Sequence, residues 1–277
     1  MSLAQTLPCR PVRLGALDWL ALHAAALWPH GGYLVQRAAD GSDDPLGLLA
    51  LAAVAALVVW HRHGLRLTPR LGWLVASMVL ALAANGAWWA GVPALPASLV
   101  AALSLVCALL AWWPATQPRV PLAGLVVLAL PWIASLQFYL GFPLRVITAQ
   151  LSAWGLQLAG FDASRSGASM EVNGQLVIVD APCSGVQMAW LAYFTGCSAA
   201  AVLGVSDRRF ARRAAWVGAI VLCANVLRNS VLVALEARPA GLSAGWHEAI
   251  GLTVLSAVCL VVLALVQRKE TPGAWLA

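Results

Sequence analysis

Three residues in the last third of the chain could together break a peptide bond: Cys183, Arg228 and His247. Cys183 stands between a proline and a Ser-Gly pair, directly before an apolar run. We therefore expect it at a helix start, presented by the backbone rather than packed away. A helix start carries partial positive charge and free N–H groups, which favour the nucleophilic thiolate. His247 could protonate a leaving amine and then activate a second nucleophile. The combination indicates acyl transfer through a cysteine.

Neighbouring residues could support this chemistry. The backbone N–H groups of Ser184 and Gly185 are expected to point toward a developing oxyanion, and Gly185 lets a peptide backbone approach closely. Arg228 cannot serve as a base, but its guanidinium could bind a carbonyl, a carboxylate or the oxyanion. Asn225 lies one turn before Arg228 on the same helix face, where it could orient the guanidinium or simply link two helices.

Each of the three residues also has a purely structural interpretation. Arg228 could extend its guanidinium to the membrane surface, and His247 could be an interfacial residue beside Trp246. Cysteines in membrane helices usually pack as small apolar residues, which we expect of Cys107, Cys197, Cys223 and Cys259. The position of Cys183 at a predicted helix start favours the chemical interpretation for that residue.

The composition predicts an all-α polytopic membrane protein. The chain has 277 residues, of which 61% are hydrophobic and only 10% charged, whereas soluble domains carry about 25% charged residues. Because about 20 apolar residues cross a bilayer as a helix, we expect eight spans, at residues 14–34, 46–60, 71–90, 94–113, 121–141, 182–203, 212–235 and 247–266. The first is the weakest, since Asp18 and His23 interrupt it.

The basic residues predict the orientation. They outnumber acidic residues by 17 to 11, yet they lie in short loops without interleaved aromatic residues, which disfavours nucleic-acid binding. If eight spans alternate, most of them fall on one side, which is then cytoplasmic together with both termini: Arg10, Arg13, Arg62, Arg66, Arg70, Arg119, Arg208, Arg209, Arg212, Arg213, Arg268 and Lys269. The opposite side holds Asp40, Asp43 and Asp44 with Arg37, Arg145, Arg165 and Arg238. This topology places Cys183, Arg228 and His247 at one depth on the outer face.

Two segments precede the cysteine on that outer face. Residues 142–160 have helical periodicity interrupted by polar residues and are predicted to form an amphipathic helix on the interface. Residues 169–180 contain an Asn-Gly pair between β-branched residues, which predicts a short β-hairpin. We therefore expect residues 1–120 to form a supporting four-helix membrane region and residues 121–277 to form the catalytic core.

The chain resembles the exosortase/archaeosortase family of membrane cysteine transpeptidases. The resemblance rests on "PCSG" at 182–185, "NVLR" at 225–228 and "HEAIG" at 247–251, in that order, and it covers about the last 140 residues. It implies Cys183 as nucleophile, Arg228 as cationic partner and His247 as general acid and base. The polar Asn229 departs from the apolar residue expected there and leaves the subfamily open.

The resemblance also implies the substrates and the location. An alanine- and tryptophan-rich composition suggests the bacterial exosortase branch, in the inner membrane with its active site facing the periplasm. Substrates would be membrane-anchored proteins with C-terminal sorting signals of the PEP-CTERM type. Cleavage would leave an acyl-enzyme thioester that an unknown acceptor nucleophile resolves. No cofactor or metal is implied.

Two other classes of function stay open. A transporter or channel could use Arg228 and Asp18 along its pathway, although no inverted repeat is visible. A non-catalytic assembly protein of the cell envelope would need no cysteine. Metal binding and serine protease chemistry are disfavoured, because the chain has no CxxC, HExxH or GxSxG motif.

Overall fold

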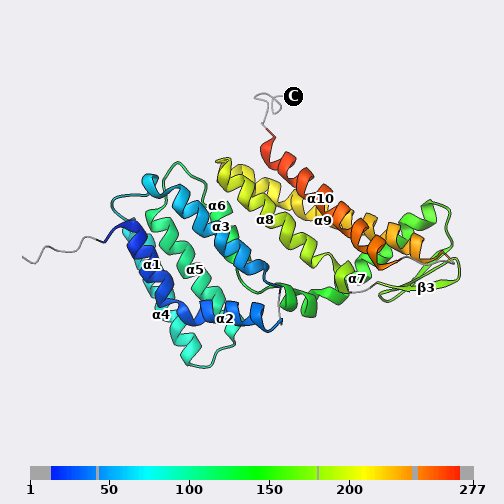
Figure 1. The fold of residues 1–277 in the computed structure, drawn as a ribbon, viewed down its shortest axis with the longest axis horizontal. Coiled ribbons are helices and arrows are strands. Elements are labelled where there is room, and N and C mark those ends of the chain that lie inside the picture. Colours follow the sequence, from blue (N-terminus) through cyan, green and yellow to red (C-terminus); the bar gives the residue numbers. More distant parts are fainter. Residues whose placement is uncertain (1–13, 42–43, 180, 239–242, 269–277) are drawn as a thin grey trace, which may run out of the picture.

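The computed structural model describes residues 14–41, 44–179, 181–238 and 243–268. Arg10, Arg13, Asp43, Asp180 and Lys269, which entered the predictions above, lie outside these ranges. Within the described residues the chain forms ten α-helices and one three-stranded sheet (Figure 1). The helices are α1 Ala16–Ala26, α2 Trp28–Ala39, α3 Leu46–Trp60, α4 Leu71–Trp89, α5 Ala94–Trp112, α6 Val120–Leu128, α7 Ile133–Leu158, α8 Val186–Val202, α9 Asp207–Glu236 and α10 Ala244–Gln267.

The first predicted span, at residues 14–34, is wrong as a single helix. Helix α1 has 11 residues and α2 has 12, and in Figure 1 the two run in clearly different directions. Pro29 lies in the first turn of α2. Because proline lacks a backbone N–H and its ring clashes with the preceding turn, it is accepted at a helix start but cannot continue α1. The apolar run is therefore divided at Leu27.

The predicted boundary between a span ending at 141 and an interfacial helix at 142–160 is also wrong. Helix α6 ends after nine residues at Leu128, and α7 leaves it at an angle of 91°. The break contains Pro131, and α7 then continues for 26 residues with Pro143 inside it. The chain therefore turns before residue 141, and α7 lies across one end of the neighbouring helices (Figure 1).

In the part of the chain that the structure describes, four helices are long and apolar enough to cross a membrane: α4, α5, α9 and α10. The bent pair α6 and α7 counts as a fifth if it forms one span. Helices α3 and α8 lie where spans were predicted, but they have only 15 and 17 residues. The chain is therefore a multi-pass helical membrane protein, and the described residues do not confirm eight spans.

The predicted hairpin is present and belongs to a larger sheet. Strands β2 (Ser169–Val172) and β3 (Gln175–Ile178) pair antiparallel around Asn173 and Gly174. Their φ angles of 50° and 79° are the positive values that a two-residue hairpin turn needs, and Asn-Gly is the preferred sequence for it. Strand β1 (Ala163–Ser166), which was not predicted, pairs with β2 and makes the order β1-β2-β3.

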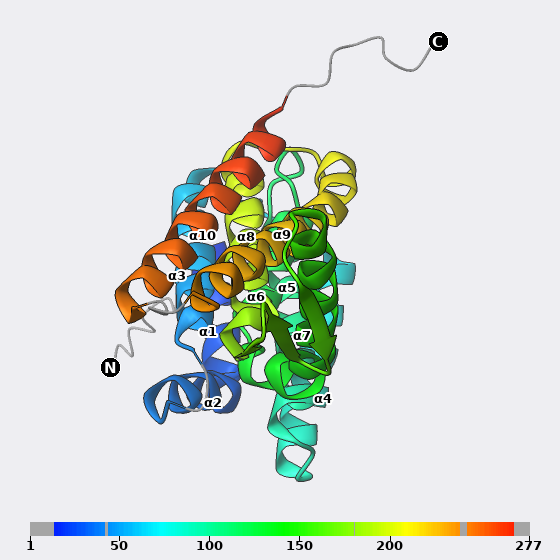
Figure 2. The same cartoon turned by 90° about the vertical axis from the view of Figure 1, so that its right-hand side faces the viewer.

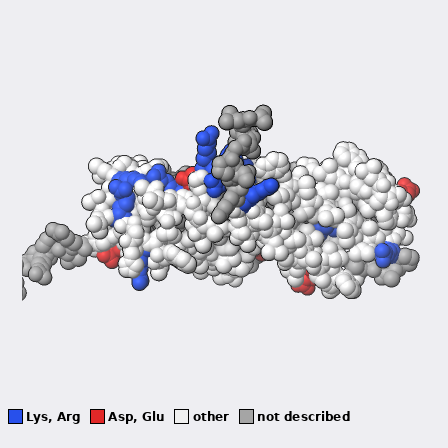
Figure 3. All heavy atoms as spheres, turned by 90° about the horizontal axis from the view of Figure 1, so that it is seen from above, with Lys and Arg blue, Asp and Glu red and all other residues white. Residues whose placement is uncertain are grey.

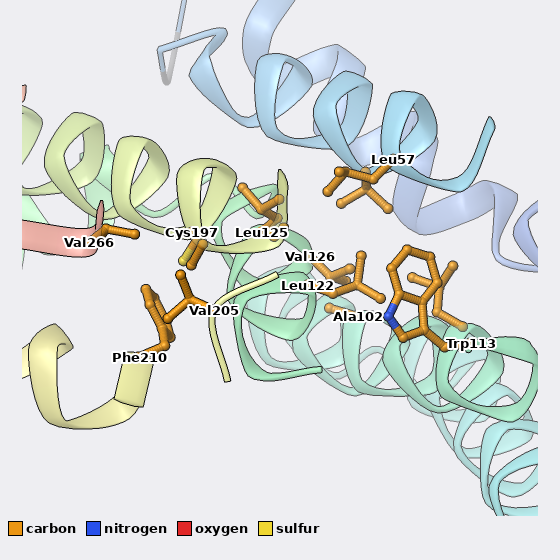
Figure 4. Close-up of a cluster of buried hydrophobic side chains, with 14 of the residues drawn as sticks. Leu57, Ala102, Trp113, Leu122, Leu125, Val126, Cys197, Val205, Phe210 and Val266 are labelled. Carbon is orange, nitrogen blue, oxygen red and sulfur yellow. The ribbon is translucent and has the colours of Figure 1, made fainter. Parts of the chain in front are cut away.

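One buried cluster joins the two halves of the chain around α6. Figure 4 shows Leu57 of α3 and Trp113 on one side of Leu125, with Cys197 of α8 and Phe210 of α9 on the other. Asp207 fixes α6 from the same side, because its Oδ1 accepts hydrogen bonds from the two backbone N–H groups at the start of α6, at 2.7 and 2.8 Å. The division at residue 120 stays a prediction, but the core extends across it.

The last three helices pack against one another in pairs, and Figure 2 shows α10, α8 and α9 side by side. Helix α8 starts at the end of the molecule where α9 finishes and α10 begins (Figure 1). This antiparallel arrangement brings the N-termini of α8 and α10 close to the C-terminal half of α9. The residues of the candidate site lie where these helix ends meet.

Candidate functional site

Cys183 lies in a tight turn directly before α8. A short 3₁₀ helix covers Ala181–Ser184, Gly185 caps α8, and the helix begins at Val186. Gly185 has a φ of +79°, a left-handed conformation that side chains disfavour. A Cβ at Gly185 would lie 3.0 Å from Cγ of Asn225, so the turn packs directly onto α9. Glycine is therefore required here both for the turn and for the close approach of the backbone to α9.

Asn225 holds the carbonyl group of Cys183. Its Nδ2 donates hydrogen bonds to Cys183 O at 2.7 Å and to Thr148 Oγ1 of α7 at 3.2 Å, and the residue is 2% exposed. A carbonyl oxygen only accepts, so the nitrogen of the amide must face it. Of the two roles considered for Asn225, these contacts correspond to the linking of helices. Asn225 links the cysteine turn, α7 and α9.

A second asparagine repeats this link one turn farther along α9. Asn229 Nδ2 donates to Ser152 Oγ of α7 at 3.0 Å, and Ser152 Oγ donates to Val226 O of α9 at 3.2 Å. Asn225 and Asn229 are four residues apart, as are Thr148 and Ser152, so the two pairs form successive steps between the helices. We call these four residues the α7–α9 polar ladder.

Sequence reasoning missed Thr148 and Ser152. Both are almost completely buried, at 1% and 0% exposed, although they lie in the segment predicted to rest on the membrane surface. The sequence did contain a sign of this contact: the two hydroxyl residues on α7 are four residues apart, and so are the two asparagines on α9. Buried polar groups need hydrogen-bond partners, so two matched pairs of this kind indicate packed helices.

Helix α7 also forms a hydrogen bond with Ser184, the residue after Cys183. Ser184 Oγ donates to Gln137 Oε1 of α7 at 3.0 Å and accepts a hydrogen bond from Val186 N at 3.3 Å. Ser184 is 4% exposed. The turn is therefore fixed on both sides of its cysteine, by Asn225 at the carbonyl of Cys183 and by Gln137 at the hydroxyl of Ser184.

Cys183 is buried, contrary to the expectation that its thiol is presented to the surroundings. The residue is 7% exposed and belongs to a cluster with Ala149 and Ala153 of α7, Met170 of β2 and Val233 of α9. Helix α7 packs directly on the turn, and Met170 and Val172 of β2 belong to the same buried cluster as Cys183.

Arg228 extends from α9 to α10. A Cβ placed on Gly251 would lie 3.2 Å from Nη2 of Arg228, so the absence of a side chain at Gly251 leaves room for the guanidinium. His247 lies one turn before Gly251 on α10, and it is exposed. The structure therefore places the guanidinium within about one helical turn of the histidine position along α10, at about 1.5 Å of rise per residue.

A pocket of about 220 Å³ lies beside Arg228, between α8, α9 and α10. Its polar lining residues are Gln187, Glu248 and Arg228. Gln187 Nε2 donates to Asp44 Oδ2 at 3.3 Å, which connects this pocket to the segment before α3. The N-terminal half of the chain therefore contacts the site, and Glu248, adjacent to His247, is a polar residue of the site that sequence reasoning did not select.

The predicted residues thus divide into two groups. Cys183, Ser184, Gly185 and Asn225 form one packed unit at the start of α8. Arg228 follows Asn225 by about one turn on α9 and leads to α10, where His247 occupies the first turns.

Comparison with known protein families gave a match. A family model described as transmembrane exosortase matches residues 38–264. This range runs from the end of α2 into the last turns of α10 and contains the candidate site. No curated protein and no solved structure matched the chain.

Proposed function

Because the chain belongs to the transmembrane exosortase family, we propose that it is an integral-membrane cysteine protease and transpeptidase that cleaves C-terminal sorting signals. Membership of the family supports a membrane-bound enzyme that processes sorting signals in general. The residue roles, the substrate type and the mechanism described next are our proposal.

Cys183 is the proposed nucleophile. Its thiolate attacks the carbonyl carbon of the scissile peptide bond and forms a C–S bond, while the negative charge that develops on the oxygen is stabilised by Arg228 and by backbone N–H groups of the turn. The C–N bond then breaks, and the leaving amine takes a proton from His247. An acyl-enzyme thioester remains on Cys183.

A second nucleophile completes the reaction. Neutral His247 removes its proton as it attacks the thioester, the C–S bond breaks, and the Cys183 thiolate is released. With water the product is a new carboxylate, and with an amine or hydroxyl acceptor the substrate is transferred. The acceptor is unknown.

The observation that carries this proposal is the connection from the cysteine turn through α9 to α10. Asn225 holds Cys183 O at 2.7 Å, Arg228 follows on the same helix, and its guanidinium packs at Gly251, one turn from His247. Positioned groups of these types are what acyl transfer needs. The 220 Å³ pocket beside Arg228 offers space for part of a substrate.

The proposal includes a topology. Most of the basic residues lie in or directly beside the α3–α4, α5–α6 and α8–α9 loops, and on the face seen in Figure 3 most of the blue side chains lie over the left and middle of the molecule. We propose that these loops are cytoplasmic and that the cysteine turn faces the periplasm, in agreement with the positive-inside rule. Eight crossings in the bacterial inner membrane, both termini inside and PEP-CTERM-type substrates belong to the same proposal.

Replacement of one cysteine tests the function. A reporter protein carrying a tail with a Pro-Glu-Pro motif, a 20-residue apolar helix and a basic end is co-expressed with the chain, and its processing is followed by mass spectrometry of the new C-terminus. Cys183→Ser should abolish processing while membrane insertion is preserved. Cys223→Ser is the matched control, since Cys223 is an exposed cysteine on α9. Processing that survives Cys183→Ser would remove the proposal.

A further inference from the structure

A second and larger pocket adjoins the cysteine turn on another side. It has a volume of about 380 Å³ and lies between α7, α8 and α9, near the bend that joins α6 to α7. Its lining is almost entirely apolar, with Leu136, Leu140 and Leu144 on α7, Ala189 on α8 and Leu222 on α9. This volume is within the range of sites that bind organic ligands, about 300–1,000 Å³.

The pocket has a polar end at the cysteine turn. Along α8 its lining runs from Gly185 to Tyr193, and along the antiparallel α9 it runs from Gly218 to Asn225. Tyr193 and Gly218 lie together, because a Cβ on Gly218 would be 3.1 Å from the hydroxyl oxygen of Tyr193. Gly185 and Asn225 lie together at the opposite end. At about 1.5 Å per residue the pocket extends about 12 Å along α8.

One hydrogen-bond acceptor at this polar end lacks a partner. Asn225 Oδ1 is buried, and among the described residues it accepts no hydrogen bond. Its nitrogen donates to Cys183 O and Thr148 Oγ1, and because a carbonyl oxygen only accepts, the amide cannot turn over without losing the bond to Cys183 O. Ser184 Oγ, which also lines the pocket, already donates and accepts. A ligand of this pocket would therefore combine an apolar body with an N–H or O–H donor near the cysteine turn.

We propose that this pocket binds an apolar segment of the substrate polypeptide directly beside the scissile bond, and that binding opens the packing around Asn225 Oδ1, which then accepts a backbone N–H of that segment. The inference rests on the proposed function and names a subsite for it. A polypeptide supplies both parts of the required chemistry, since apolar side chains fill the 12 Å length while the backbone carries the donor. A lipid acyl chain would fill the same volume but carries no donor along its length, so only a headgroup could reach the acceptor; the adjoining Cys183 turn favours the substrate polypeptide as the occupant.

Substitution within the pocket gives the first test. Ala189→Leu places extra apolar volume in the pocket, and Ala257→Leu on the exposed side of α10 is the matched control. Two reporter tails are compared, one with leucines and one with alanines beside the cleavage motif. We expect Ala189→Leu to slow processing of the leucine tail about tenfold, a typical effect of a few methylene groups in an apolar subsite. The alanine tail should slow less than about twofold, as should both tails with Ala257→Leu. Equal slowing of both tails by Ala189→Leu would overturn the inference.

Photo-crosslinking gives a second test that needs no catalysis. A benzophenone amino acid replaces Leu222 or Leu140 in the pocket, or Leu227 as the control. Leu227 is exposed on the same helix as Leu222 but about 140° around it, at 100° per residue. Adducts with the reporter tail from Leu222 and Leu140, and few or none from Leu227, are expected. Adducts with phospholipid alone at Leu222 and Leu140 would overturn the inference.

The two tests separate the inference from the proposed function. A reporter that the unaltered chain never processes, but that crosslinks at Leu222, would contradict the proposed function and support the pocket assignment. A reporter that is processed, but crosslinks only at Leu227, would support the function and contradict the assignment.

Discussion

Removing the side chain of Asn225 should slow processing by more than the loss of folded protein explains. Asn225→Ala deletes the hydrogen bonds to Cys183 O and Thr148 Oγ1, at 2.7 and 3.2 Å. The carbonyl of Cys183 then stays buried without this donor, which costs about 1–3 kcal/mol. If that free energy holds the turn in its reactive position, its loss corresponds to a decrease of about 5- to 150-fold in kcat/KM, at about 1.4 kcal/mol per tenfold.

The matched control is Asn229→Ala, one turn away on α9. Asn229 is equally buried, at 2% exposed, and its deletion removes a similar amide–hydroxyl bond to Ser152. Asn229 does not hydrogen-bond the cysteine turn. We therefore expect the two variants to lower the Tm of the detergent-solubilised protein by similar amounts, while only Asn225→Ala slows reporter processing per folded molecule.

An isosteric variant separates hydrogen bonding from packing. Asn225→Asp keeps the size of the side chain but replaces the donor nitrogen by oxygen, so it should also slow processing. Thr148→Val removes one acceptor of the amide while the bond to Cys183 O stays, and should cost less than about fivefold. Equal activity losses in Asn225→Ala and Asn229→Ala, or full activity in Asn225→Asp, would refute the positioning role of Asn225.

Three further substitutions have distinct expected outcomes. Gly185→Ala forces a side chain into a left-handed conformation with its Cβ 3.0 Å from Asn225 Cγ; it should destabilise the protein by at least about 1–2 kcal/mol and slow processing, and unchanged Tm and activity would contradict this. Gly251→Ala places a Cβ 3.2 Å from Nη2 of Arg228; because the guanidinium can shift, it should reduce kcat with little change in Tm, and an unchanged kcat would argue against a role for the guanidinium at this position. Asp207→Ala removes the acceptor for the two N–H groups at the start of α6; it should cost about 1 kcal/mol and lower Tm, with processing per folded molecule unchanged.

Local chemistry was sufficient to predict some elements. The Asn173-Gly174 pair determined the turn between β2 and β3, because both residues tolerate the positive φ angles it needs. The long apolar runs located α4, α5, α9 and α10 to within a few residues, apart from the longer start of α9. These features depend only on residues that are adjacent in the sequence, so they could be predicted from it.

The helix boundaries were predicted wrongly where the chain changes direction inside a continuous apolar run, because hydropathy alone does not show such a bend. Pro29 and Pro131 interrupt apolar runs that a hydropathy window treats as continuous. The first divides α1 from α2, and the second lies in the 91° bend before α7. Strand β1 was missed because its residues, Ala163–Ser166, are mostly polar and exposed.

The choice of the site residues stays a prediction from the motifs, whereas the packing around them is visible in the structure and was not predicted. The motifs selected Cys183, Arg228 and His247 by residue type and order. The partners of Asn225 could not be read from the motif, because Thr148 belongs to a helix that sequence reasoning placed on the membrane surface. The burial of Cys183 has the same origin, since it depends on residues of α7 and β2 that pack in the same cluster.

The most direct test of the central claim is a search for the covalent intermediate. The purified chain is mixed with the reporter, quenched in acid within the first turnover and digested, and each cysteine peptide is examined by mass spectrometry. A thioester adduct on the peptide that contains Cys183, which hydroxylamine removes and which Arg228→Ala or His247→Ala diminishes, is the predicted result. Processing of the reporter with an adduct on Cys223 or Cys259 instead, and none on Cys183, would contradict the assignment of the nucleophile.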